Sequence, residues 1–145
     1  MTTIFIMSLK NLFWLAVLAI VAVSCAKFFS KGTKQVGELA AFANLGVDEF
    51  QTFIADGNVQ LLDVRTLDEF NEGHIAGAVL VDVNENGFLE KAKAVLNPER
   101  PVAVYCRSGR RSARVASMLA GQGYKVTNLG GGVLAWQDAG KALVK

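Results

Sequence analysis

The chain has 145 residues, the size of a single domain, and 52% of them are hydrophobic against 19% charged. This composition is typical of a globular protein and excludes extensive disorder. The 15 Lys and Arg residues and the 13 Asp and Glu residues leave a net charge of +2, which excludes a protein that binds nucleic acid by neutralising many phosphates.

The first 24 residues have the pattern of a targeting signal. Lys10 precedes an uninterrupted apolar run over residues 12–23 (LFWLAVLAIVAV). This run is shorter than the roughly 20 residues that a membrane-spanning helix needs, and its length is typical of a cleaved signal peptide. If translation begins at Met7 instead of Met1, the segment ahead of the apolar run is shorter and begins with residues 7–10 (MSLK).

Residues 21–25 (VAVSC) resemble a bacterial lipobox, although Leu is favoured at the position that Ala22 holds. The resemblance implies cleavage before Cys25 and lipidation of its thiol, so we expect an exported lipoprotein anchored to a membrane, facing the periplasm. An uncleaved N-terminal anchor and ordinary secretion are the alternatives. Residues 25–43 then form a lysine-containing tether, and residues 44–145 form the folded domain.

Helical and extended patterns alternate through this domain. They predict helices over 47–54, 67–72, 88–96, 112–122 and from the glycines at 130–132 through Trp136, and strands over 59–64, 78–83, 102–105 and 125–129. Strands separated by helices at short intervals predict an α/β fold, with a mostly parallel sheet and helices on both faces.

Cys106 directly follows the most apolar strand and precedes a helix, in residues 102–112 (VAVYCRSGRRS). Ligands of parallel sheets gather beyond the carboxyl ends of the strands. Gly109 permits a positive φ, and a helix that begins near Ser112 leaves its first amides free to surround one anionic atom. Nearby positive charges would also favour a thiolate. They are Arg107, Arg110, Arg111 and Arg114.

Two interpretations in which these residues have no catalytic role remain open. Cys106 could be a buried structural cysteine, and the arginines could be a basic patch on an exposed helix face. The chain has only two cysteines. If Cys25 is lipidated, Cys106 has no partner for an internal disulfide, and an unpaired thiol in an exported protein points to a function.

Residues 106–112 (CRSGRRS) resemble the active-site loop of small single-domain rhodaneses. Residues 61–66 (LLDVRT), with 73–78 (GHIAGA), resemble the upstream motif of that family, and 130–136 (GGGVLAW) resemble its C-terminal motif. The similarity covers roughly residues 45–140 in the family's order. It implies a rhodanese-like fold and a sulfurtransferase that stores sulfur as a Cys106 persulfide.

The resemblance also implies roles for single residues. Cys106 is the nucleophile that takes sulfur from thiosulfate or another sulfane-sulfur donor and passes it to a thiol, sulfite or cyanide, without a metal or organic cofactor. Arg107 and Arg111 are expected to bind the anionic donor, with contributions from Ser108 and Arg110, while Gly109 shapes the loop.

Related folds include phosphatases and inactive modules, so the family alone does not define the activity. The phosphatases carry a phosphate-binding Arg six positions after the cysteine, and this chain has Ser112 there. A non-catalytic module that carries a persulfide or polysulfide, or binds a protein, is the alternative that we retain.

Four other residues could belong to the site or to the scaffold. Asp63 is expected to orient backbone amides and Arg65 to form an internal ion pair near the loop, in support of the site. His74, the only histidine, lies in a turn where a structural hydrogen bond is favoured over general base catalysis. Trp136 is expected in the core.

Overall fold

The computed structural model describes residues 41–145. The predicted signal peptide, Cys25 and the tether up to residue 40 lie outside the described residues. Within 41–145, none of the helices has both the length and the apolar character needed to cross a membrane.

Strands and helices alternate along the described chain. They are β1 (Ala43–Leu45), α2 (Val47–Ile54), β2 (Gln60–Asp63), α3 (Leu67–Glu72), β3 (Val79–Leu80), α4 (Phe88–Val95), β4 (Val102–Tyr105), α5 (Arg110–Gly121), β5 (Val126–Leu129) and α6 (Gly132–Asp138). Most predicted elements are confirmed to within two residues at each end. Strand β3 is shorter than the predicted 78–83, because it is an edge strand that pairs with β2 alone.

The five strands form one sheet in the order β1-β5-β4-β2-β3, and every neighbouring pair is parallel. Strand β4 is central, with Val104 opposite Leu62 of β2 on one side and Asn128 of β5 on the other. The α/β fold with a parallel sheet is therefore confirmed. The central position of β4 places the residue that follows it at the middle of the sheet's carboxyl edge.

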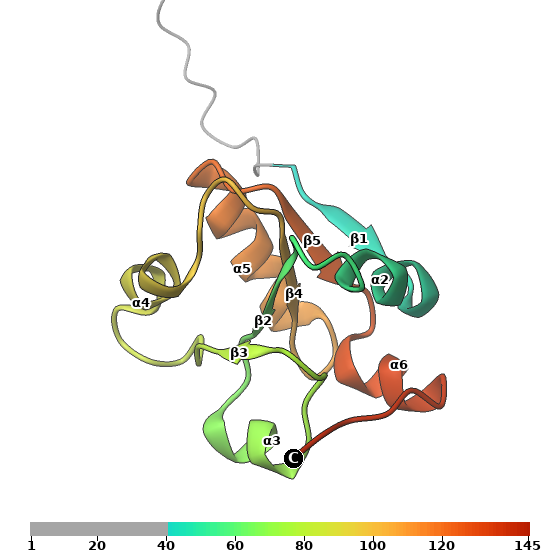
Figure 1. The fold of residues 1–145 in the computed structure, drawn as a ribbon. Coiled ribbons are helices and arrows are strands. Elements are labelled where there is room, and N and C mark those ends of the chain that lie inside the picture. The colour runs from blue at the N-terminus through green and yellow to red at the C-terminus, as the bar shows by residue number, and fades with distance from the viewer. Residues whose placement is uncertain (1–40) are drawn as a thin grey trace, which may run out of the picture. The chain divides into compact units, whose positions relative to one another are not determined.

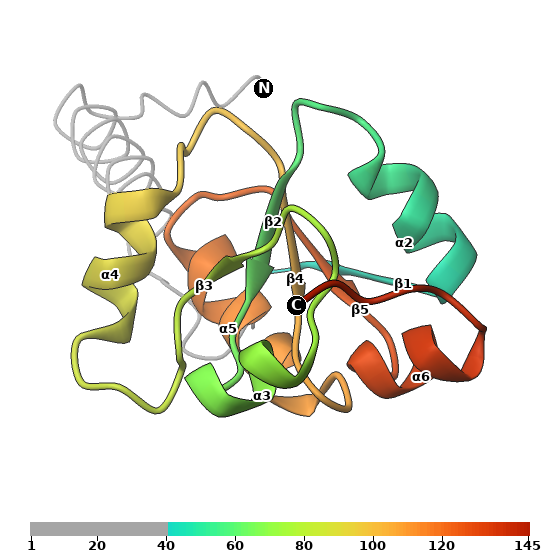
Figure 2. The same ribbon diagram turned by 60° about the horizontal axis from the view of Figure 1, so that its bottom comes forward.

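Helices cover both faces of this sheet, and Figures 1 and 2 show α4 and α5 on one face and α2 and α6 on the other. Successive residues of β4 point to opposite faces. Val102 and Val104 belong to the core cluster under α4 and α5. Ala103 and Tyr105 belong to the cluster under α2 and α6. All four β4 side chains are buried, which explains the continuous apolar run in the sequence.

Strand β1 is an addition to the predicted elements. It pairs with β5, with Ala43 opposite Thr127 and Leu45 opposite Leu129. Phe42, just before it, packs partly buried against the core. The strand thus lies across the predicted boundary between tether and domain. A three-residue strand held by backbone pairing leaves no periodic pattern in the sequence, which is why the sequence did not predict it.

Candidate active site

Cys106 leaves the carboxyl end of β4 and lies inside the protein, with only 1% of its surface exposed. It is the one free cysteine among residues 41–145. Its side chain belongs to the core cluster on the α5 side of the sheet. The thiol therefore points from the centre of the sheet toward the start of α5.

The loop after Cys106 is shorter than the sequence predicted, because α5 begins at Arg110 and not near Ser112. Gly109 is the residue before the helix and has φ +85°. A Cβ at this position would lie 3.0 Å from the Gly131 nitrogen and 3.1 Å from the Leu129 oxygen. The loop therefore needs glycine here both for the left-handed backbone and for the lack of space.

Hydrogen-bond donors surround the sulfur of Cys106. The Ser112 Oγ lies 3.3 Å from Sγ, and backbone amides also point to it, from Ser108, Gly109 and Ser112. Burial by itself raises the pKa of the Cys106 thiol, but these hydrogen bonds outweigh that effect and bring the pKa below its ordinary value. The loop is thus arranged to hold a negative charge at sulfur.

The start of α6 fixes the other side of the loop. The Val133 amide donates to the Cys106 carbonyl (2.8 Å), and the Leu134 amide donates to the Arg107 carbonyl (3.1 Å). Gly132 has φ +61°, and a Cβ there would overlap the Cys106 carbonyl oxygen and lie 2.6 Å from the Arg107 carbonyl carbon. The Gly-rich motif therefore serves as a close support for the Cys106 loop.

Arg65 forms the internal ion pair that was expected of it, and its partner is Asp63 at the end of β2. Asp63 is fully buried and accepts hydrogen bonds from the Arg65 amide (3.0 Å), Nε (2.9 Å to Oδ2) and Nη2 (2.6 Å). Arg65 also donates to the Gly73 carbonyl (2.9 Å) and lies 5.5 Å from the centre of the Tyr105 ring. These contacts support the expected scaffold role, since both charges are satisfied inside the protein.

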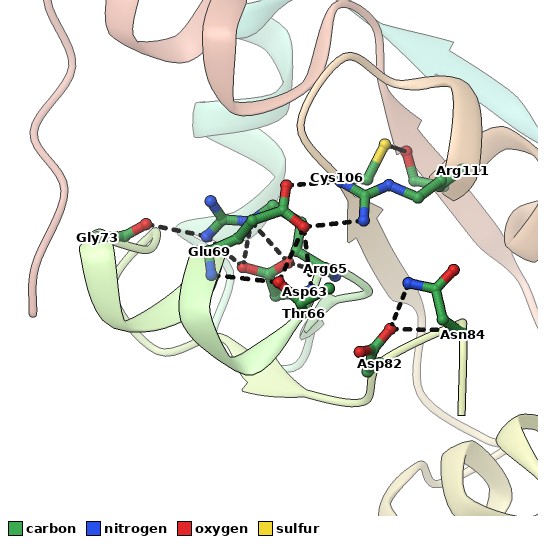
Figure 3. Close-up of polar contacts among 10 residues, drawn as sticks. Asp63, Arg65, Thr66, Glu69, Gly73, Asp82, Asn84, Cys106 and Arg111 are labelled. Carbon is green, nitrogen blue, oxygen red and sulfur yellow. Dashed lines mark hydrogen bonds and ion pairs between the residues drawn. The ribbon is translucent and has the colours of Figure 1, made fainter. Parts of the chain in front are cut away.

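Arg111, one of the two residues predicted to bind the donor, makes a bidentate ion pair with Glu69 of α3. The distances are 2.9 Å from Nη1 to Oε2 and 2.6 Å from Nη2 to Oε1 (Figure 3). Hydrogen bonds from Arg111 lower the pKa of Glu69 to about 2. The pKa of Arg111 is raised by Glu69 and, to a smaller extent, by the Cys106 sulfur. Arg111 thus links α3 to the surroundings of the Cys106 sulfur.

Glu69 is a site residue that the sequence reasoning missed. Its carboxylate also accepts a hydrogen bond from the Thr66 amide (3.1 Å), while its own amide donates to the Thr66 hydroxyl (3.3 Å). This capping box was visible in the sequence as Thr-x-x-Glu. It indicates the start of a helix, but it carries no information about an arginine 42 positions away.

The other predicted loop residues are accessible. Arg107, Ser108 and Arg110 are exposed. Ser108, Arg110 and Arg111 line an open cleft of ≈ 610 Å³ together with Arg114. All the charged residues that line this cleft are arginines. This cleft therefore presents positive charge beside the Cys106 loop, although one of its arginines, Arg111, is paired with Glu69.

His74 and Trp136 have structural contacts. The His74 Nδ1 lies 3.2 Å from the Phe70 oxygen, and its ring stacks on Phe70 at 3.7 Å. Its backbone pairs with Val144. Trp136 is buried against Phe50, and its Nε1 donates to the Ala142 oxygen (3.0 Å). Both residues therefore make the structural contacts that were expected of them.

Metal ligands do not gather in this part of the protein: across residues 41–145, there is no group of three or more His, Cys, Asp and Glu side chains that could hold a metal ion.

The domain is similar to known proteins of one family. The family model of the rhodanese-like domain matches residues 46–139. The chain is 39% identical over 107 residues to Thiosulfate sulfurtransferase 18 of Arabidopsis thaliana, covering 66% of this chain and 78% of that protein. It is 35% identical over 104 residues to Thiosulfate sulfurtransferase GlpE of Shewanella oneidensis, covering 70% of this chain and 98% of that protein.

The fold agrees as well. A rhodanese-related protein from Thermoplasma volcanium superposes with a TM-score of 0.63 at 25% identity, covering 71% of this chain and 98% of that chain. A structure from Staphylococcus saprophyticus superposes with a TM-score of 0.61 at 30% identity, covering 72% of this chain and 100% of that chain. The expected rhodanese-like fold is confirmed, and the chain belongs to the family of rhodanese-like domain proteins.

Proposed function

We propose that this protein is a sulfurtransferase that carries sulfane sulfur as a persulfide on Cys106. The observation that carries the proposal is the set of hydrogen-bond donors around its sulfur, from the Ser112 hydroxyl and three backbone amides. They stabilise a thiolate before the reaction, and the same donors suit the negative charge of a persulfide. The names of two relatives, both thiosulfate sulfurtransferases, support thiosulfate as the donor.

In the first step, the Cys106 thiolate attacks the outer sulfur of thiosulfate. A new S–S bond forms to Cys106, the S–S bond of thiosulfate breaks, and its electron pair leaves with sulfite. The cleft lined by Arg110, Arg111 and Arg114 offers positive charge to the dianionic donor. Because the thiolate is already favoured, this step needs no general base, in accord with the structural contacts of His74.

In the second step, a thiol, sulfite or cyanide attacks the outer sulfur of the persulfide. The bond between that sulfur and the Cys106 Sγ breaks, and its electron pair restores the thiolate. Donor and acceptor therefore react in turn, in a ping-pong sequence.

Turnover with thiosulfate and cyanide tests the proposal. We expect the full chain to release sulfite and form thiocyanate, and we expect Cys106→Ser to do neither. Equal rates for the two proteins would contradict it. A wild-type protein that forms the persulfide but transfers its sulfur to none of the acceptors would instead favour the non-catalytic carrier.

Phosphate ester hydrolysis is disfavoured because Ser112 is fully buried and directed at the Cys106 sulfur, where the related phosphatases carry an arginine. A chromogenic phosphate ester tests this point. Hydrolysis that disappears in Cys106→Ser would contradict the sulfurtransferase assignment.

We also propose that Cys25 carries a lipid anchor and that the domain works outside the cytoplasm. The lipobox-like residues 21–25 (VAVSC) support this proposal. In the producing bacterium, Cys25→Ala should prevent lipid attachment and leave an unprocessed chain that migrates more slowly than the wild type. Equal migration of the two proteins, with no lipid on the wild-type chain, would favour an uncleaved anchor.

A further inference from the structure

A second and smaller pocket, of ≈ 180 Å³, adjoins the Cys106 loop between α3 and α6. Its polar lining includes Arg107, Glu72 of α3 and Gln137 of α6, and its apolar lining comes from Val133 and Leu134. Arg107 directly follows Cys106, and consecutive Cα atoms are about 3.8 Å apart. Arg107 therefore joins the pocket to the Cys106 loop, although Cys106 itself does not line the pocket.

Two other charged residues line the pocket, but their charges are already satisfied. Arg65 is paired with Asp63, and Glu69 is paired with Arg111. By contrast, Arg107 and Glu72 form no ion pair or side-chain hydrogen bond with any other residue of the described chain, nor with each other. The pocket thus offers one free cation and one free carboxylate.

This pocket differs in charge from the arginine-lined cleft. Arg111 lines the cleft and Glu69 lines the pocket, so their ion pair lies between the two. The cleft suits an anion, whereas the pocket suits a ligand with both charges. Donor and acceptor bind one after the other in a ping-pong sequence. Both can therefore react at the Cys106 sulfur while they contact different residues around it.

We propose that the pocket binds the ammonium and carboxylate groups of a small zwitterionic aminothiol, which accepts the sulfur. The carboxylate lies at Arg107 and the ammonium at Glu72, and the volume of ≈ 180 Å³ limits the bound part to the size of one amino acid. This inference rests on the proposed persulfide chemistry. The acceptor thiolate bonds to the outer sulfur and leaves as a persulfide, while the electron pair of the broken S–S bond returns to Cys106.

The test uses the full chain, first loaded with sulfur by thiosulfate and then freed of the donor. Its reaction with L-cysteine, cysteamine, 3-mercaptopropionate and 2-mercaptoethanol is followed in single turnovers at neutral pH. Glu72→Gln should slow the two amine-bearing thiols by about two- to fivefold, the range of a partly exposed ion pair. Arg107→Gln should slow the two carboxylate-bearing thiols by a similar factor.

For each thiol, the rate with the variant is divided by the rate with wild type. The intrinsic nucleophilicity of the thiol therefore cancels. The neutral 2-mercaptoethanol is the reference thiol, and within each variant the slowing of the charged thiols is measured relative to it. Asp68→Asn is the matched control, because Asp68 is an exposed carboxylate of α3 that does not line the pocket. A variant that slows all four thiols equally, or none of them, would overturn the inference.

Binding of S-methyl-L-cysteine, which cannot accept sulfur, separates this inference from the proposed function. In NMR titrations, wild type and Asp68→Asn should bind it equally and Glu72→Gln about two- to fivefold more weakly. This result is expected even if thiosulfate does not load Cys106. Equal binding by wild type and Glu72→Gln would count against the pocket alone, and a failure to load Cys106 would count against the sulfurtransferase.

Discussion

The Ser112 hydroxyl lies 3.3 Å from the sulfur of Cys106 and 3.2 Å from the Gly109 carbonyl oxygen. It has one hydrogen to donate, and a thiolate competes for it more strongly than a neutral carbonyl because hydrogen bonds to charged groups are stronger. The contact connects the first turn of α5 with the end of β4. It makes Ser112 part of the environment that favours the ionised thiol.

Ser112→Ala should raise the pKa of Cys106, because it removes a donor that stabilises the thiolate. A hydrogen bond to a charged group contributes about 1.5–3 kcal/mol, so alkylation by iodoacetamide should slow by about tenfold or more at pH values below the pKa. At high pH, where both thiols are ionised, the two rates should converge. Ser117→Ala on the same helix is the control. An unchanged pH profile for Ser112→Ala would contradict this role.

Gly132→Ala should destabilise the protein and disturb the Cys106 loop. The new Cβ would overlap the loop backbone, and φ at this position is +61°. Gly140→Ala is the matched control, with φ +72° and no atom within 4 Å of the new Cβ. The left-handed backbone alone should cost Gly140→Ala about 1–2 kcal/mol, and the overlap should add about 1–3 kcal/mol for Gly132→Ala. Equal unfolding free energies in urea would contradict the close support by α6.

The Glu69–Arg111 ion pair should make stability depend on pH. The pKa of Glu69 is lowered to about 2 in the folded protein, against about 4.3 for an unperturbed Glu. The stabilisation is therefore fully present above the unfolded pKa and is lost as the pH falls toward 2.

Glu69→Gln should lower the free energy of unfolding by about 1 kcal/mol at pH 7, the range of a partly exposed pair. The difference from wild type should shrink as the pH falls below about 4. Asp68→Asn in the same helix turn is the control. A difference that stays constant down to pH 2 would show that the effect does not come from the ion pair.

Asp63→Asn should destabilise the protein far more than the loss of a surface carboxylate. It would leave the guanidinium of Arg65, a residue that is only 4% exposed, without its charged partner. Breaking a buried pair in this way costs about 3–5 kcal/mol. Asp82→Asn, at a less buried aspartate whose carboxylate accepts from Asn84, should cost under about 1 kcal/mol. Similar unfolding midpoints for the two variants in urea would contradict the scaffold role of Asp63.

The features that depend on neighbouring residues in the sequence, such as most helices and strands, could be predicted. The apolar run of β4 and the cysteine that follows it are adjacent in the chain, so the position of Cys106 at the sheet edge could be predicted directly. The glycine after Ser108 correctly indicated a positive φ, but it did not give the helix start at Arg110. Gly109, just before that start, lies against the backbone of Gly131, a contact between residues far apart in the sequence.

Contacts between distant residues could not be predicted in this way. The pairing of Glu69 with Arg111 depends on how α3 and α5 meet beyond the carboxyl ends of β2 and β4, and neither residue specifies the other. Arg111 was expected to bind the donor, and the structure shows that it is paired with Glu69. The role of Gly132 also appears only when α6 lies against the Cys106 loop.

The mass of the Cys106-containing peptide after exposure of the reduced full chain to thiosulfate tests the central proposal most directly. We predict a gain of one sulfur atom on Cys106, reversed by cyanide and absent in Cys106→Ser. A peptide of unchanged mass, from wild-type protein whose Cys106 still reacts with iodoacetamide, would contradict the proposal that this residue carries sulfur.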